Sequence, residues 1–264
     1  MNSILRAIWT YRGFILGSIQ REFQLKYRHS MLGAAWTVLN PLAMITVYTV
    51  IFAQIMRTRL PGVESTFGYS IYLCAGILAW NLFAEIAGRC QNVFLENANL
   101  IKKLSFPRIC LPIIVAGSAL LNFAIIFGLF TLFLLVSGNF PGWAYLAVFP
   151  VLGLEILFSL GLGMVLGVLN VFFRDVGQLF GVVLQFWFWL TPIVYPAAIL
   201  PEAARPLMAL NPMARITGAC QTALVSGQTP AWGSLWPVAL LAGLLCLWGL
   251  RLFRRHAGEM VDEL

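Results

Sequence analysis

Six apolar stretches divide this chain, and each is long enough to cross a lipid bilayer. They cover residues 34–56, 70–87, 112–136, 144–172, 177–194 and 232–253. A helix needs about 20 mostly apolar residues to span the hydrocarbon core. With 60% hydrophobic and 10% charged residues, the chain leaves no segment long enough for an independent soluble domain. We therefore expect one all-α integral membrane domain over residues 1–264, with six transmembrane helices.

The basic residues are sorted between the two sides of these stretches. The side that carries the N-terminal segment holds 13 of the 17 Lys and Arg residues. Under the positive-inside rule, this distribution places both ends of the chain in the cytoplasm. The net charge of +7 comes from basic residues on the cytoplasmic side, where anionic lipid headgroups attract them. We therefore expect membrane lipid, and not nucleic acid, as the partner of these charges.

Residues 1–33 have the pattern of an amphipathic helix. Ile15, Ile19 and Phe23 recur at helical spacing, opposite Gln20 and Gln24. Such a helix lies in the cytoplasmic headgroup layer. It either anchors the chain or frames a cytoplasmic entrance.

The cytoplasmic gap at residues 88–111 mixes apolar and charged residues, and Pro107 ends any helix in it. It is too polar for lipid and too apolar for a fully wetted loop. A short amphipathic helix satisfies both properties, either on the membrane face or in the groove of a partner protein.

The external gap at residues 195–231 is apolar but interrupted by prolines. A segment of this kind cannot span the membrane. We expect short re-entrant or interfacial helices, which are tolerated where protein or a wet cavity covers the backbone. A plain external loop is the alternative, although it is usually more polar.

Residues for catalysis or metal binding are sparse. The two histidines flank apolar stretches without a carboxylate motif, and the five cysteines form no CxxC pair. No G-x-x-x-x-G-K-[ST] motif is present, so the chain does not cradle ATP itself. A membrane-embedded transferase would need an acid or base cluster, which is missing. Glu155 lies at mid-depth of the fourth stretch, either in a proton relay or neutral and hydrogen-bonded to Asn122 or Gln185.

The fifth stretch carries a polar and aromatic stripe on one helical face. Gln185 and Trp189 belong to it, and Tyr48 and Phe52 stack one turn apart on the first stretch. Trp187 lies deeper than an interfacial aromatic belt requires. These side chains either line a pathway, where aromatic faces contact sugar rings, or pack against lipid. In the fourth stretch, three glycines form a small-residue packing surface: Gly161, Gly163 and Gly167.

The order of several motifs resembles the permease subunits of polysaccharide-exporting ABC transporters. The motifs are LKYRHSMLGAAW at 25–36 with LNPL at 39–42, NLIKK at 99–103, FPR at 106–108 with LP at 111–112, NVFFRDV at 170–176, PIVYP at 192–196 and NP at 211–212. Together they cover nearly the whole chain. The pattern is most similar to that of the O-antigen exporters of Gram-negative bacteria, with teichoic-acid and capsule exporters as near relatives.

The resemblance implies a type-2 ABC exporter permease fold in the bacterial inner membrane. It implies a homodimer joined to two copies of an ATPase subunit, which binds the ATP and magnesium, so that this chain holds no cofactor and is not an enzyme. The cargo implied is an undecaprenyl-linked O-antigen-type polysaccharide, carried from cytoplasm to periplasm. Export of teichoic acid, capsule, a small lipid or a drug is the alternative.

The resemblance also implies roles for particular residues. Coupling to the ATPase maps to Asn97, Asn99, Leu100, Ile101, Lys102, Lys103, Phe106, Pro107, Arg108, Arg174 and Asp175. The channel lining maps to Tyr48, Phe52, Gln185, Trp187 and Trp189. The periplasmic gate maps to Pro192, Tyr195, Pro196, Pro201, Asn211 and Pro212, and the entrance helix to Arg21, Phe23, Lys26, Tyr27 and Arg28.

Overall fold

The computed structural model describes residues 6, 9–27, 35–51, 67–103, 106–197, 201–202 and 205–264. In these residues every regular element is a helix, which confirms the expected all-α class. The elements in chain order are α2 (Arg12–Tyr27), α3 (Trp36–Thr49), α4 (Gly68–Glu96), α5 (Ala98–Lys103), α6 (Cys110–Val136), η3 (Gly142–Ala147), α7 (Val148–Phe172), α8 (Asp175–Trp189), α9 (Arg205–Leu210), α10 (Pro212–Val225), α11 (Trp232–His256) and α12 (Glu259–Glu263).

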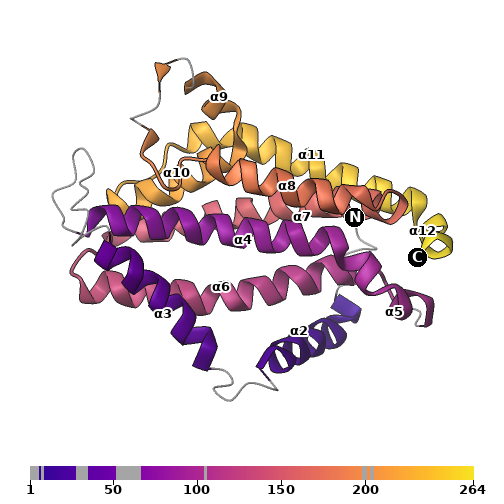
Figure 1. The fold of residues 1–264 in the computed structure, drawn as a ribbon. Coiled ribbons are helices and arrows are strands. Elements are labelled where there is room, and N and C mark those ends of the chain that lie inside the picture. The colour runs from indigo at the N-terminus through magenta and orange to yellow at the C-terminus, as the bar shows by residue number, and fades with distance from the viewer. Residues whose placement is uncertain are drawn as a thin grey trace.

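Four long helices, α4, α6, α7 and α11, run side by side along the molecule (Figure 1). Each of them, with η3 added to α7, is long and apolar enough to cross a membrane. α7 packs against both α4 and α11 in the centre of the bundle. α6 and α11 expose large apolar side chains outward, among them Leu132, Leu135, Leu244 and Trp248. Such outward faces suit contact with lipid chains.

Close packing of α7 depends on the three glycines in its sequence. A Cβ atom on Gly161 would lie 2.8 Å from the backbone nitrogen of Cys246 on α11. Cβ atoms on Gly163 and Gly167 would lie 2.5 and 2.7 Å from atoms of Cys90 on α4. Because glycine has no side chain, the backbone of α7 can approach those of α4 and α11 closely at these three positions. The small-residue surface therefore packs within the subunit.

The first and fifth predicted spans are not membrane-length helices within the described residues. α3 has 14 residues and is followed by helical residues 50 and 51, where the described part of this span ends, so its full length lies outside the described residues. α8 has 15 residues, fewer than the roughly 20 that a straight span needs. α8 ends at Trp189, before the predicted end at residue 194, because Pro192 cannot continue a helix and the chain turns there. Four of the six predicted spans are confirmed as membrane-length helices. The six-span arrangement stays a prediction.

α4 is longer than the sequence pattern indicated. It continues past residue 87 to Glu96, so the first part of the predicted coupling segment at 88–111 is helical, and the membrane boundary at residue 87 stays a prediction. No proline interrupts this segment, and its polar side chains find partners on neighbouring helices. Gln91 Nε2 donates to the carbonyl of Gly177 on α8 at 2.9 Å, and Arg89 pairs with Glu22 on α2. Tertiary contacts therefore allow the helix to continue.

α2 packs against the first half of α6. Ile15 is 7% exposed and forms a buried cluster with Cys110 and Ile114 of α6. Ile19 packs against this cluster. The apolar face predicted for this helix therefore contacts protein, while Leu16 points outward and is 65% exposed. Its location in the headgroup layer stays a prediction.

The external segment contains two short helices, α9 and α10. Asn211 caps α10: its side-chain oxygen accepts hydrogen bonds from the amides of Met213 and Ala214 at 3.0 and 3.3 Å. Pro212 occupies the first turn, where a missing amide hydrogen costs nothing. α10 packs against α4 and buries Met213, at 0% exposure. The segment is thus folded onto the bundle, and its re-entrant position stays a prediction.

Candidate functional site

The short helix α5 is anchored on one side and open on the other. Ile101 is 5% exposed in the core, and the half-buried Leu100 packs against the core. Asn97 ends α4, where its Nδ2 donates to the carbonyl of Val93 at 2.8 Å. Asn99 and Lys102 are exposed. Of the predicted coupling residues on this helix, Asn99 and Lys102 are therefore the ones presented outward; the side chain of Lys103 lies outside the described part.

The segment after α5 is tied to both ends of the chain. Phe106 packs on Phe14 of α2, with ring centroids 5.2 Å apart. Arg108 donates a hydrogen bond from Nη1 to the carbonyl of Ala257, in the turn between α11 and α12. Phe106 and Arg108 thus act in internal contacts, and the half-buried Pro107 lies between them.

The turn between α7 and α8 presents Arg174 and Asp175, both exposed. Asn170, which is 1% exposed, holds this turn. Its Oδ1 accepts from the amide of Gly177 at 2.9 Å, and its Nδ2 donates to the carbonyl of Gln91 at 3.1 Å. The Gly177 amide belongs to the first turn of α8, where amides lack helical partners. Asn170 therefore fixes the start of α8 on α4.

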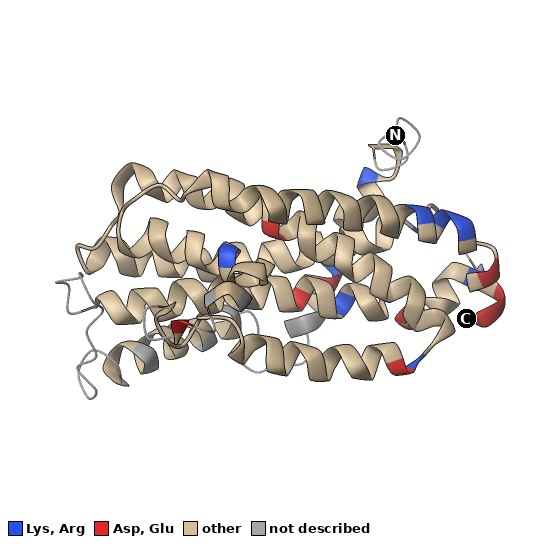
Figure 2. Cartoon of the chain, turned by 90° about the horizontal axis from the view of Figure 1, so that it is seen from above, with Lys and Arg blue, Asp and Glu red and all other residues tan. Residues whose placement is uncertain are grey.

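Charged residues gather at the end of the bundle that carries the C-terminus (Figure 2). This end includes the exposed Arg254, Arg255, Asp262 and Glu263. α12 contacts both α5 and α7, so the C-terminal helix and α5 belong to one surface.

α8 exposes most of its length. Only Phe180 is buried in it, while Gln185 is exposed and Trp189 is 64% exposed. Both line an open cavity of about 390 Å³ with Trp80, Leu184 and Phe188. This size lies within the range of ligand pockets. The side chain of Tyr48, and all of Phe52, lie outside the described residues.

Trp187 points the other way, into the subunit. Its ring lies 5.2 Å from that of Phe83 and 6.3 Å from that of Trp80 between centroids. Its Nε1 donates to Oδ1 of Asn211 at 2.8 Å. The geometry therefore favours Gln185 and Trp189 over Trp187 as residues of an open surface, and it gives Asn211 a structural role beside its capping role.

The turn after α8 leaves several backbone carbonyls without helical partners. Tyr72 donates to the carbonyls of Pro192 and Tyr195 at 3.0 and 3.1 Å, and Tyr69 donates to that of Val194 at 2.5 Å. Gln221 of α10 also donates to the Pro192 carbonyl, at 3.3 Å. The sequence alone did not single out these partners. The turn is thus held by protein donors, as buried non-helical backbone requires.

The predicted gate residues differ in their burial. Tyr195 donates its hydroxyl to the carbonyl of Trp189 at 2.8 Å, and burial raises the pKa of Tyr195, so that it remains a neutral donor. Pro192 is buried, Pro196 is half-buried and Pro201 is exposed.

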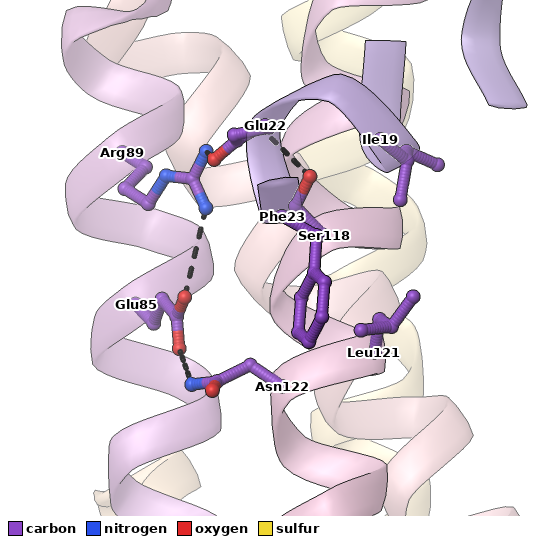
Figure 3. Close-up of a pocket in the computed structure, with 8 residues that line it drawn as sticks. All are labelled: Ile19, Glu22, Phe23, Glu85, Arg89, Ser118, Leu121 and Asn122. Carbon is purple, nitrogen blue, oxygen red and sulfur yellow. Dashed lines mark hydrogen bonds and ion pairs between the residues drawn. The ribbon is translucent and has the colours of Figure 1, made fainter. Parts of the chain in front are cut away.

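A polar network fastens α2 to α4 and α6 (Figure 3). Arg89 of α4 pairs with Glu22 of α2 and lies 3.6 Å from Glu85, one turn away. Glu22 accepts from the hydroxyl of Ser118 at 2.8 Å, and Glu85 accepts from Asn122 at 3.3 Å. The sequence missed this network because its five members come from four different predicted elements.

Among the predicted entrance residues, Arg21 is exposed and Phe23 is half-buried at the small cavity beside this network. The side chains of Lys26 and Tyr27, and Arg28 as a whole, lie outside the described part. The network thus holds the middle of α2 against the bundle and leaves Arg21 outward.

Comparison with known proteins decides the family. A family model described as ABC-2 type transporter matches residues 15–225, most of the chain. The chain belongs to the ABC-2 type transporter membrane family. An O-antigen export system permease protein RfbA from Myxococcus xanthus is 30% identical over 267 residues, covering 100% of both chains.

Two further relatives widen the comparison. A protein of the same name from Klebsiella pneumoniae is 30% identical over 195 residues, 74% of this chain and 73% of that protein. The polysialic acid transport protein KpsM of Escherichia coli is 22% identical over 244 residues, 92% of this chain and 93% of that protein. As a member of the ABC-2 family, the chain is a membrane-embedded transport component with several apolar helices.

Glu155 of this ABC-2 protein differs from its predicted environment. It is 0% exposed, and both side-chain oxygens lack a hydrogen-bond partner in the described part of the structure. Asn122, one predicted partner, bonds to Glu85 instead, and Gln185, the other, is exposed on α8. The prediction of a hydrogen bond to either was wrong, because both lie on other faces of the bundle. Among the described residues, no cluster of His, Cys, Asp or Glu has the composition of a metal site.

Proposed function

We propose that this chain is the membrane-spanning subunit of an ATP-driven polysaccharide exporter. The cargo is an undecaprenyl-linked, O-antigen-type glycan that moves from the cytoplasm to the periplasm. The observation that carries this proposal is the end-to-end match to an O-antigen export permease at 30% identity. The open face of α8, with Gln185 and Trp189 beside an accessible cavity, supports it because amide and aromatic groups suit sugar rings.

The proposal includes a homodimer in the inner membrane with both ends cytoplasmic. α3, α4 and α8 form one face, with α4 between the other two (Figure 1). α8 keeps apolar side chains exposed there, including Leu179, Val182 and Phe186. A second copy facing this one would cover these side chains and enclose a pathway between the subunits. In this arrangement α3 and α8 complete the six spans, and α9 with α10 forms the external gate.

ATP hydrolysis belongs to two copies of a separate ATPase subunit, which hold ATP and magnesium. α5 and the turn after α7 are the docking elements, since they expose Asn99, Lys102, Arg174 and Asp175, and α5 and α7 both contact the C-terminal helix α12. Ile101 and Asn170 connect these exposed residues to the core. Force on the docking elements would therefore reach α4 and α8 directly.

The test is co-purification and transport in proteoliposomes that contain the permease, its ATPase and a labelled undecaprenyl-linked glycan. Replacing Lys102 and Arg174 together by glutamate should release the ATPase and abolish ATP-dependent uptake of the glycan. The matched control is Arg251→Glu, a charge reversal at an exposed position of α11 outside the proposed docking elements, which should retain both. Transport by the permease alone, or by the wild-type complex without ATP, would contradict the proposal.

Capsule-type polysaccharide is the second candidate cargo. The match to a polysialic acid transport protein over 92% of this chain favours it over small lipids or drugs. Competition between labelled O-antigen and capsule glycans for uptake separates these two candidates.

A further inference from the structure

The middle of α4 was not connected with a translocation pathway by the sequence. α4 is the most enclosed of the helices around the α3–α4–α8 face, yet Asn81 near its centre is exposed. The other exposed residue of α4 is Glu96 at its last position. Ile77, Ala84 and Gly88, one turn or two from Asn81 on the same side, are half-exposed. These four residues form an accessible stripe along one side of α4, and the side-chain amide of Asn81 belongs to it.

This amide has an unusual environment. Asn81 makes no hydrogen bond to any residue that the structure describes, although it lies within a helix of membrane-spanning length. Polar side chains at such depth face a bundle interior or a wet cavity, because hydrocarbon offers no hydrogen-bond partner. A lipid-facing position is thus unfavourable for Asn81.

Two cavities are lined by consecutive residues of α4. Asn81 lines one of about 140 Å³ with Pro41 and Met44 of α3. The preceding residue, Trp80, lines the open cavity of about 390 Å³ with Gln185 and Trp189 of α8. Neighbouring residues of α4 thus face α3 on one side and α8 on the other. The stripe therefore lies between these two helices, each of which contacts α4.

We propose that Asn81 is a glycan-contacting residue and that α4 forms the floor of the translocation path. A primary amide offers two donors and an oxygen acceptor, which complement the hydroxyl groups of a sugar. Gln185 supplies the same chemistry from α8, and Trp189 supplies an aromatic face. This inference rests on the proposed function and adds a residue and a helix to it.

A second copy of the chain is the competing occupant. Asn side chains hydrogen-bond across helices in membranes and stabilise helix pairs. In that case Asn81 would hold the dimer and would not contact cargo. The experiment must therefore separate contact with glycan from contact between subunits.

The experiment uses the complete permease–ATPase complex in proteoliposomes with a labelled undecaprenyl-linked glycan. A photo-crosslinking amino acid replaces Asn81 in one variant and Leu244, on the outward face of α11, in the control. With ATP present, the label should couple to position 81 and not to position 244. A crosslink from position 81 only to the second subunit, or only to lipid, would overturn the proposal.

Kinetics give the second measurement. Asn81→Leu should raise the KM for glycan about fivefold to tenfold, the effect of losing one or two hydrogen bonds. Asn81→Gln should recover part of this loss, and the dimer should remain intact in both variants by size-exclusion chromatography. An unchanged KM in Asn81→Leu, or dissociation of the dimer, would count against glycan contact. If the wild-type complex exports no glycan, the proposed function fails. If the wild-type complex exports glycan normally and the Asn81 variants are unaffected, the proposed function stands and only the role of Asn81 is refuted.

Discussion

Asn170 offers the sharpest test of how the subunit is held together. Its side chain is 1% exposed at the end of α7 and makes three hydrogen bonds. Nδ2 donates to the Gln91 carbonyl at 3.1 Å and to Oδ1 of Asn92 at 3.0 Å, and Oδ1 accepts from the Gly177 amide at 2.9 Å. One side chain thus joins α4, α7 and α8.

Asn170→Ala removes all three bonds without adding bulk. At about 0.6 kcal/mol for each bond inside a bilayer, the loss is about 2 kcal/mol. The Gly177 amide and the Gln91 carbonyl are then left without a side-chain partner, which raises the loss toward about 4 kcal/mol. We expect the free energy of unfolding to fall by about 2–4 kcal/mol.

The assay is reversible unfolding in mixed micelles with a rising fraction of SDS, followed by tryptophan fluorescence. Asn92→Ala is the matched control, because it removes one of the three bonds from a half-buried position and should cost less than about 1 kcal/mol. A loss for Asn170→Ala no larger than that of the control would refute the reasoning. It would mean that α8 is positioned by apolar packing and not by this amide.

Three further predictions concern neighbouring contacts. Gly163→Ala places a Cβ atom 2.5 Å from that of Cys90 and should lower the free energy of unfolding by about 1–3 kcal/mol. Gly153→Ala is the control, because Gly153 has open space around it, and it should change the free energy of unfolding by no more than about 0.5 kcal/mol. Trp187→Phe removes the hydrogen bond to α10 and should lower stability by about 1 kcal/mol in the same SDS titration; an unchanged midpoint would contradict this contact. Arg89→Met should cost less than about 1 kcal/mol, because the pair is partly exposed, yet proteolysis within α2 should become faster; equal cleavage rates would show that other contacts hold α2.

The membrane class and the long helices could be predicted from the sequence because they depend on local composition. A helix in lipid must satisfy its own backbone and needs about 20 apolar residues, so hydropathy marks it directly. The α5 segment and the proline-rich external segment were also identifiable. Their mixture of polar and apolar residues fits neither lipid nor water. Asn170 was found as part of a motif, but two of its three partners, Gln91 and Asn92, come from α4, far away in the chain.

The wrong prediction at Glu155 has a physical origin. It received the wrong partners because sequence spacing does not define the direction of a face in the bundle. Trp187 and Trp189 are two residues apart on α8, and therefore about 200° apart around the helix axis. One enters the core and the other remains exposed. The sequence pattern placed Trp189 on a stripe with Gln185, but only the positions of α4 and α10 show that Trp187 packs inside the subunit.

By itself, the amino-acid sequence determined that this chain is a multi-helix membrane protein, because hydrophobic transfer and charge sorting act residue by residue. The tertiary structure decided which polar groups meet. Glu22 reaches Arg89, and Tyr72 holds the turn after α8, only because separate helices pack side by side. It also decided that Asn81 is exposed beside a cavity between α4 and α3. Such pairings depend on the rotation of each helix about its own axis and on contact between segments that are distant in the chain. The local sequence pattern determines neither.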